Sequence, residues 1–104
     1  DRTLIAQKIC SAIVRLQEKE ALGIVIDLLR GANNQQIHDK GYQNIKTFGA
    51  AKDISWRDLQ QYIIQLLNQG VLEIWFHEGG RLLLTALAKR ILFEGTKIKL
   101  ATLL

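Results

Sequence analysis

The sequence has little of the chemistry that marks metalloproteins or disulfide-stabilised proteins. It contains no Pro, no Met and a single Cys, Cys10, in 104 residues. One Cys cannot form an internal disulfide, which fits a reducing compartment. Cys10 lies in an apolar helical pattern, where packing is a more common role than that of a reactive thiol. His38 and His77 are far apart and have no Cys or carboxylate at ligand spacing, so we expect no metal ligands in this chain.

Signals for membranes and secretion are missing as well. No apolar run approaches the roughly 18 residues that a membrane-spanning helix needs. No basic segment precedes an apolar stretch and a small-residue cleavage site. The chain begins at Asp1 and has no Met at all. We therefore expect a piece of a longer cytoplasmic polypeptide that has no membrane partner.

Sequence motifs for catalysis are also absent. The chain has neither a phosphate-binding loop of Walker type nor a strand–GxGxxG–helix unit, and its histidines have no suitable triad partners. Asp27, Asp39 and Asp53 lie where helix caps and turns are expected, rather than as a pair in a cleft. We expect no catalytic residues and no cofactor here, so this chain alone should not be an enzyme.

An excess of positive charge stands out against an otherwise ordinary composition. The apolar fraction of 48% and the charged fraction of 23% fit one domain with a modest core. The net charge is +4, which is compatible with an anionic partner. The cations gather in two segments, with Arg30, Lys40, Lys46, Lys52 and Arg57 in the first and Arg81, Lys89, Arg90, Lys97 and Lys99 in the second.

The first half of the chain has a helical pattern. Thr3 is the expected N-cap of a first helix, and residues 17–20 are its expected solvated end. Residues 23–30 are ambiguous. Their first half favours a strand, whereas the later leucines and Gly31 favour a short helix with a C′ glycine. Residues 33–34, both Asn, can cap a further turn.

A stronger helix signal begins at Ser55, an N-cap with Asp58 at the N3 position of a capping box. The helix should end near Gly70. Its apolar stripe is predicted to comprise Trp56, Leu59, Ile63, Leu66 and Leu67.

After Gly70 the period changes to two, which predicts strands over residues 72–77 and 81–84. A three-residue loop over residues 78–80 turns one face of both strands toward the core. The residues expected on that face are Leu72, Ile74, Phe76, Leu82 and Leu84.

Thr85 is the expected cap of a last helix, which stops at Gly95 and leaves residues 96–104 as an extended tail. These elements together predict a mainly α (α+β) fold of the winged-helix type. Its parts are a helix-turn-helix core, a short β-hairpin wing and a further C-terminal helix.

One stretch is more specific than the periodicity. Residues 29–31 read Leu-Arg-Gly, Asn33 follows, and residues 48–53 read Phe-Gly-Ala-Ala-Lys-Asp. This series resembles the RecQ C-terminal (RQC) domain, the winged-helix module of RecQ-family DNA helicases. The resemblance extends over nearly the whole chain and favours a helix for residues 23–30. It implies a DNA-binding domain over residues 1–95, followed by a tail or linker over residues 96–104.

The resemblance implies a DNA-binding surface at both ends of that stretch. In the family the Arg of the LRG motif contacts the DNA backbone, and here it is Arg30. A cation that complements the helix macrodipole is the alternative. Asn33 can donate to a phosphate or cap a turn, and Lys52 precedes a helix N-terminus that attracts phosphate. The chain departs from many relatives at Ala32, Ala51 and Ile64, where Ser, Gly and Arg are common.

The helix that follows adds Ser55, Arg57, Gln60 and Gln61 to the expected DNA-binding residues. The glutamines can read base edges, with a solvated amide face as the alternative.

On the wing, Trp75 and His77 can stack on an end base, although Trp75 can instead pack against Trp56 or Leu83. In some relatives an aromatic residue at the tip of a longer wing separates base pairs. The tip expected here, residues 78–80, carries no aromatic ring and resembles the short wings of bacterial members. We therefore expect anchoring of duplex or forked DNA rather than strand separation.

The resemblance implies a DNA-binding module of an ATP-dependent RecQ-type helicase, which unwinds in the 3′–5′ direction in DNA repair, recombination and replication. ATP, Mg and Zn would belong to helicase domains outside this chain. We expect a nucleoid-associated monomer that binds DNA with little sequence preference. Two alternatives stay open. One is a sequence-specific transcription regulator that reads DNA with residues 55–70. The other is a protein-interaction module with an exposed patch of Tyr62, Ile64, Trp75 and Leu83.

Overall fold

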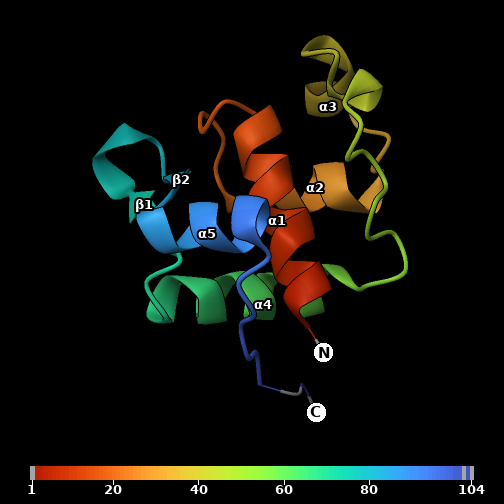
Figure 1. The fold of residues 1–104 in the computed structure, drawn as a ribbon. Helices are drawn as coiled ribbons and strands as arrows, with labels where there is room; N and C mark the ends of the chain where they lie inside the picture. The colour runs from red at the N-terminus through yellow and green to blue at the C-terminus, as the bar shows by residue number, and fades with distance from the viewer. Residues whose placement is uncertain (1, 102, 104) are drawn as a thin grey trace.

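A computed structural model describes residues 2–101 and 103 and has the predicted winged-helix fold (Figure 1). Helices α1, α2 and α4 form the helical core, and a two-stranded antiparallel hairpin with helix α5 completes the domain. Among the described residues, no helix has the length and apolar character needed to cross a membrane. The elements in chain order are α1 (Thr3–Arg15), α2 (Leu22–Arg30), α3 (Gln35–Asp39), η1 (Tyr42–Asn44), α4 (Trp56–Asn68), β1 (Leu72–Trp75), η2 (Phe76–Glu78), β2 (Arg81–Leu84) and α5 (Ala86–Glu94).

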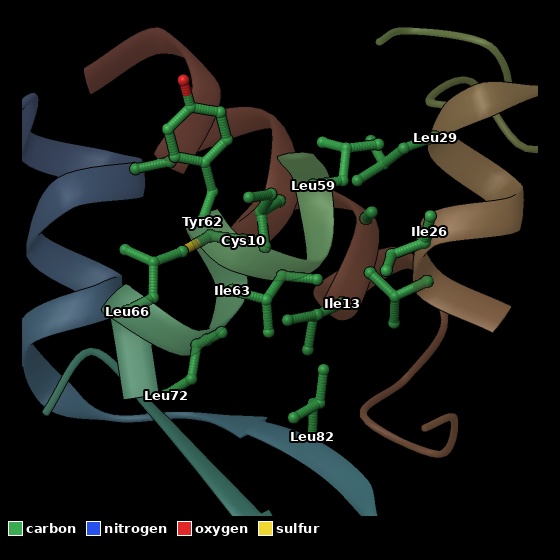
Figure 2. Close-up of a cluster of buried hydrophobic side chains, with 14 of the residues drawn as sticks. Cys10, Ile13, Ile26, Leu29, Leu59, Tyr62, Ile63, Leu66, Leu72 and Leu82 are labelled. Carbon is green, nitrogen blue, oxygen red and sulfur yellow. The ribbon is translucent and has the colours of Figure 1, made fainter. Parts of the chain in front are cut away.

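The core lies where α1, α2 and α4 face the hairpin (Figure 2). Burying one such Leu or Ile side chain contributes roughly 1.5–3 kcal/mol. The predicted stripe of α4 needs one correction. Trp56 is 38% exposed, whereas Tyr62 is only 7% exposed and belongs to the buried face. The fully buried side chains of this core include Ile9, Ile13, Ile26, Leu29, Leu59, Ile63, Leu66 and Leu82.

The hairpin has the predicted face parity but a longer loop. Leu72 pairs with Leu84 and Ile74 with Leu82, so the pairing is shifted by two residues from that of a three-residue loop. The loop is Phe76–Gly80, and its first three residues form the 3₁₀ turn η2. A shift of two keeps the same residues on the core face, because side chains alternate along a strand. Phe76 alone leaves that face and is 79% exposed, so its predicted core position is wrong.

Residues 17–20 are not a solvated helix end, as the charged sequence suggested. Gln17 and Glu18 adopt positive φ angles of 60° and 56°, which ends α1 and turns the chain toward the wing. The Glu18 carboxylate accepts a hydrogen bond from the Leu84 amide at 2.8 Å. Three residues later, Ala21 forms a β-bridge with Arg81. The charged run therefore serves as a partner for the edge of the hairpin.

Glu20 joins this linker to the segment after α3. Its carboxylate accepts hydrogen bonds from the Lys40 ammonium and the Tyr42 hydroxyl. Burial acts to raise the pKa of Glu20, but these two bonds and the charges of Lys40 and Lys19 outweigh it, so the pKa lies below its ordinary value. Burial, together with the bond to and the charge of Glu20, raises the pKa of Tyr42 to about 12.

Most of the predicted helix ends are correct. The Ser55 side chain accepts from the Asp58 amide and the Thr85 side chain from the Ala88 amide, and Gly31 and Gly95 end their helices in the left-handed conformation. Thr3 is the exception, because it is the first residue of α1 and Arg2 occupies the N-cap.

The Thr3 hydroxyl instead exchanges hydrogen bonds with the backbone of Ile98, in the segment after α5. That segment is extended and crosses α1 and α4, with Leu100 buried. Residues 102 and 104 of the predicted tail, like Asp1, lie outside the described residues. The role of the tail as a linker to another domain stays a prediction.

Candidate nucleic-acid interface

The C-terminus of α2 ends in a Schellman motif, which explains the glycine of the LRG sequence. The Gly31 amide donates to the Leu28 carbonyl at 3.1 Å and the Ala32 amide to the Asp27 carbonyl at 2.9 Å. Gly31 has φ +67°, a conformation that costs side-chain-bearing residues about 1–2 kcal/mol. The motif therefore fixes the direction in which the chain leaves Arg30.

The Leu-Arg-Gly sequence of residues 29–31 and the Phe-Gly-Ala-Ala-Lys-Asp sequence of residues 48–53 are in contact, although Gly31 and Phe48 are 17 positions apart in the chain. The Gly49 amide donates to the Leu28 carbonyl at 2.9 Å, and the Ala51 amide donates to the Leu29 carbonyl at 2.8 Å. These carbonyls belong to the last turn of α2, which has no amide of its own helix left to bond. A Cβ on Gly31 would lie 3.2 Å from the Gly49 Cα, so the backbones cross too closely for a side chain there.

Arg30 connects this crossing to the start of α4. Its Nε donates to the carbonyl oxygen of Ile54 at 3.0 Å, and the residue is exposed. Its place in the last turn of α2 also fits the macrodipole alternative, which this bond does not exclude. Lys52, also exposed, lies two residues before Ile54. Both cations lie beside the first turn of α4.

The first turn of α4 carries two further predicted residues. Ser55 is exposed and its hydroxyl caps the helix by accepting from the Asp58 amide at 3.1 Å. Arg57, the second residue of the helix, is exposed in the same turn. The N-terminal end of a 13-residue helix carries partial positive charge, and Arg30, Lys52 and Arg57 add to it. We call Arg30, Lys52 and Arg57 the basic cluster.

The remaining polar residues of α4 divide into two groups. Gln60 and Gln61, predicted to read bases, are half-buried. Gln65 and Gln69 are occupied by the tail, because Gln65 exchanges two hydrogen bonds with the Ala101 backbone and Gln69 donates to the Lys99 carbonyl at 2.8 Å. The C-terminal half of this face is therefore engaged by the protein itself.

Asn33 and Asn34 have different roles. Asn34 caps α3, because its side chain accepts from the Ile37 amide at 3.0 Å and donates to the Asp27 carboxylate at 3.1 Å. Asn33 is exposed, and its side-chain oxygen lies 3.3 Å from His38 Nε2. The capping that was considered for Asn33 is thus performed by its neighbour, and Asn33 lies on the surface just after Gly31.

The wing holds a layered cluster. Trp75 stacks on His77, with ring centroids 5.7 Å apart, and the Arg81 guanidinium lies 4.5 Å from the Trp75 centroid. Arg81 also donates to the Glu78 carboxylate at 2.8 Å and to the Glu18 carbonyl at 2.9 Å. Trp75 therefore packs within the wing, against His77 and Arg81.

Phe76 is a candidate for contact with nucleic acid that the sequence pattern missed, because strict alternation assigned it to the core. Its neighbours Trp75 and His77 stack together, and the Phe76 ring is 79% exposed at the start of the loop. No sequence signal marks the longer loop, because a Gly-Gly pair is equally typical of a two-residue turn. In the structure Gly79 and Gly80 have φ +72° and +75° and end a five-residue loop.

Other kinds of site find little support in the part of the chain that the structure describes. No group of three or more His, Cys, Asp or Glu side chains is placed to hold a metal ion. Cys10 is buried, and burial raises the pKa of its thiol to about 12. Such a thiol stays protonated near neutral pH and is a poor nucleophile.

The fold is that of a winged-helix domain, with the exposed cations Arg30, Lys52 and Arg57 near the N-terminal end of α4, beside Asp53 and Asp58. The chain belongs to the RQC domain family, which matches residues 1–103. It is 34% identical over 102 residues to the ATP-dependent DNA helicase RecQ of Pasteurella multocida, and 33% identical over 102 residues to that of Haemophilus influenzae. Each alignment covers 97% of this chain and 16% of the relative.

A mouse protein, the bifunctional 3′-5′ exonuclease/ATP-dependent helicase WRN, is 40% identical over 62 residues, which are 57% of this chain and 4% of that protein. The chain thus spans about one sixth of the length of the bacterial relatives that it matches.

Proposed function

We propose that this chain is the DNA-binding module of an ATP-dependent RecQ-type helicase, and that it anchors duplex or forked DNA through backbone phosphates. The observation that carries the proposal is the basic cluster at the N-terminal end of α4, where Arg30 bonds the Ile54 carbonyl and the exposed Lys52 follows the crossing of Gly31 and Gly49. Arg and Lys side chains beside a helix N-terminus are a common phosphate-binding arrangement. Contacts of this kind carry no base information, so binding should depend little on sequence.

The parent protein would supply the rest of the activity. Unwinding in the 3′–5′ direction, with ATP, Mg and Zn, belongs in this proposal to domains outside the chain. The names of the bacterial relatives support a helicase as the parent. The module would act as a monomeric part of that protein at the nucleoid, in DNA repair, recombination and replication.

A second part of the proposed function is a stacking contact made by the wing. Phe76 is the most exposed large apolar side chain among the described residues, and it lies in the wing loop. A base stacked on an aromatic ring gains about 1–3 kcal/mol. We assign to Phe76 the stacking contact on the last base pair of a duplex, with Trp75 and His77 as the support beneath the loop.

Two rival functions have less support. A transcription regulator would need the exposed face of α4 for reading bases, but Gln65 and Gln69 of that face bind the tail. A protein-interaction module would need the apolar patch expected around Tyr62 and Trp75. Ile64 of that patch is 38% exposed, but Tyr62 is 7% exposed, and Trp75 is stacked against His77 and Arg81.

The test is fluorescence anisotropy of the domain with a labelled forked duplex over a range of salt concentrations. Each phosphate contact contributes about 0.9 to the slope of log K against log salt. Lys52→Ala and Arg30→Ala should each weaken binding and reduce the slope by about that amount. Lys19→Ala serves as the control, since it removes the same charge from an exposed site in the linker between α1 and α2.

A second fork of scrambled sequence separates the alternatives. Equal affinity for both forks is the expected result. A strong preference for one fork would favour the regulator, and no binding even at low salt would overturn the proposal.

A further inference from the structure

Lys8 forms a long-range contact that the proposed DNA-binding residues do not explain. It lies in the second turn of α1, far in sequence from the basic cluster, and its side chain is half-buried. Its Nζ donates to the carbonyl oxygen of Ala50 at 2.9 Å. A lysine side chain carries about 2 kcal/mol of rotamer entropy, so a lysine held at one carbonyl loses much of its freedom. We therefore expect this contact to stabilise the segment that contains Ala50.

The carbonyl that Lys8 binds belongs to a short segment fixed on both sides. The amides before and after it, those of Gly49 and Ala51, donate to the Leu28 and Leu29 carbonyls of α2. The Ala50 carbonyl bonds α1 through Lys8. Residues 49–51 are thus held between two helices, by amides toward α2 and by a carbonyl toward α1.

The charge of Lys8 strengthens its bond to this segment. The donor to the Ala50 carbonyl is an ammonium group, and a hydrogen bond from a charged group is stronger than one between neutral groups. Lys8 therefore does more for this segment than a neutral side chain of the same length would do.

The held segment leads directly into the basic cluster. Lys52 is the next residue but one after Ala50, and Ile54, whose carbonyl binds the Arg30 Nε, follows two residues later. The position of residues 49–51 consequently sets where Lys52 lies and where Arg30 finds its partner. Both cations depend on the same short piece of backbone.

We propose that Lys8 is a positioning residue for DNA binding, which holds residues 49–51 so that Lys52 and Arg30 can meet phosphates together, and that it does not contact DNA itself. This inference rests on the proposed function. It differs from two simpler roles for Lys8. A direct phosphate contact would act independently of Lys52, and a purely structural contact would change stability without changing the affinity of the folded domain.

A double-mutant cycle tests the inference on the domain, with anisotropy on the forked duplex at fixed salt and thermal unfolding measured beside it. Lys8→Met should weaken binding about three- to tenfold at a temperature where the variant is folded. In a Lys52→Ala, Arg30→Ala background the same change should cost less than about twofold, because the cations that it positions are gone. Lys8→Arg, which keeps a charged donor, should recover part of the loss, and Lys19→Met should change binding far less.

Three other outcomes would contradict the inference. An equal loss in both backgrounds would identify a direct phosphate contact, and unchanged affinity for folded Lys8→Met would reduce Lys8 to a stabilising role. Either result overturns the inference while leaving the proposed function in place. Failure of the unmutated domain to bind the fork at low salt would overturn both.

A measurement on the unmutated domain covers the case in which Lys8→Met does not fold. The ¹⁵N resonances of the lysine ammonium groups can be followed while forked DNA is added. The Lys52 resonance should shift and that of Lys8 should stay nearly unchanged, since its bond to Ala50 persists. A Lys8 shift as large as that of Lys52 would contradict the positioning role.

Discussion

Gly31 occupies a backbone position that a side chain would destabilise in two ways. Its φ of +67° is unfavourable for other residues, and an added Cβ would lie 3.2 Å from the Gly49 Cα. Gly31→Ala should therefore lower the free energy of unfolding by about 2–3 kcal/mol, as measured by urea denaturation. Part of this loss in stability comes from the positive φ angle, and the rest comes from forcing the backbones of residues 31 and 49 apart.

Gly95 provides the matched control for this change. It also ends a helix, with φ +70°, but an added Cβ there would meet nothing within 4 Å. Gly95→Ala should thus cost only about 1 kcal/mol, the conformational part. Equal losses for the two variants would show that the crossing of Gly31 and Gly49 contributes nothing.

Single residues were predictable from the sequence where their partners are local. The helix-capping roles predicted for Ser55, Thr85 and Gly31 depend on residues within four positions, and all three are found. Thr3 fails because its hydroxyl bonds Ile98, 95 residues away in the chain. Glu20 was missed for the same reason, since its partners Lys40 and Tyr42 come from another part of the fold.

The hairpin shows what a sequence pattern can and cannot determine for a whole element. Alternation correctly gave the core-facing residues of both strands, because a register shift of two preserves the face of every side chain. The loop length is not encoded in that alternation. It depends on Gly79 and Gly80, whose positive φ angles allow a five-residue loop. The error in length hid the exposure of Phe76, which is 79% exposed in the loop.

The exposed Phe76 ring leads to a prediction about the wing. Phe76→Ala should weaken binding to a forked duplex about fivefold or more, because a stacked base is lost. Stability should change by less than about 0.5 kcal/mol, since the ring is 79% exposed. Anisotropy and thermal unfolding measure the two effects.

Phe93 offers the comparison for the wing, because it is 72% exposed on α5 and lies outside the wing. Phe93→Ala should leave the fork affinity unchanged. If both substitutions reduced binding alike, the effect would reflect general apolar contact with DNA, and the stacking assignment to Phe76 would be wrong.

At the scale of the whole molecule, α4 separates the two proposed DNA contacts. The basic cluster lies at its N-terminal end, and its C-terminal end leads within four residues into β1 and the wing (Figure 1). Thirteen residues of helix span about 20 Å. A duplex held by its phosphates at the first site can therefore present its end to Phe76 at the second. The order of the helices and the approximate length of α4 were predictable from the sequence, but the exposed position of Phe76 at the second site was not.

The tail after α5 yields the last prediction, which concerns the boundary of the folded unit. Residues 96–101 lie along α1 and α4, with Leu100 only 6% exposed and Gln65 and Gln69 bonded to the backbone of the segment. A free linker could be removed without loss, whereas a packed segment contributes buried area. Removal of residues 96–104 should therefore lower the free energy of unfolding by at least about 2 kcal/mol, measured by urea denaturation. Leu100→Ala should account for most of that loss, and Lys99→Ala, at an exposed position, should stay within about 0.5 kcal/mol of the unmutated domain. An unchanged stability after truncation would place the end of the folded unit at Gly95 and would leave the C-terminal half of α4 open to DNA.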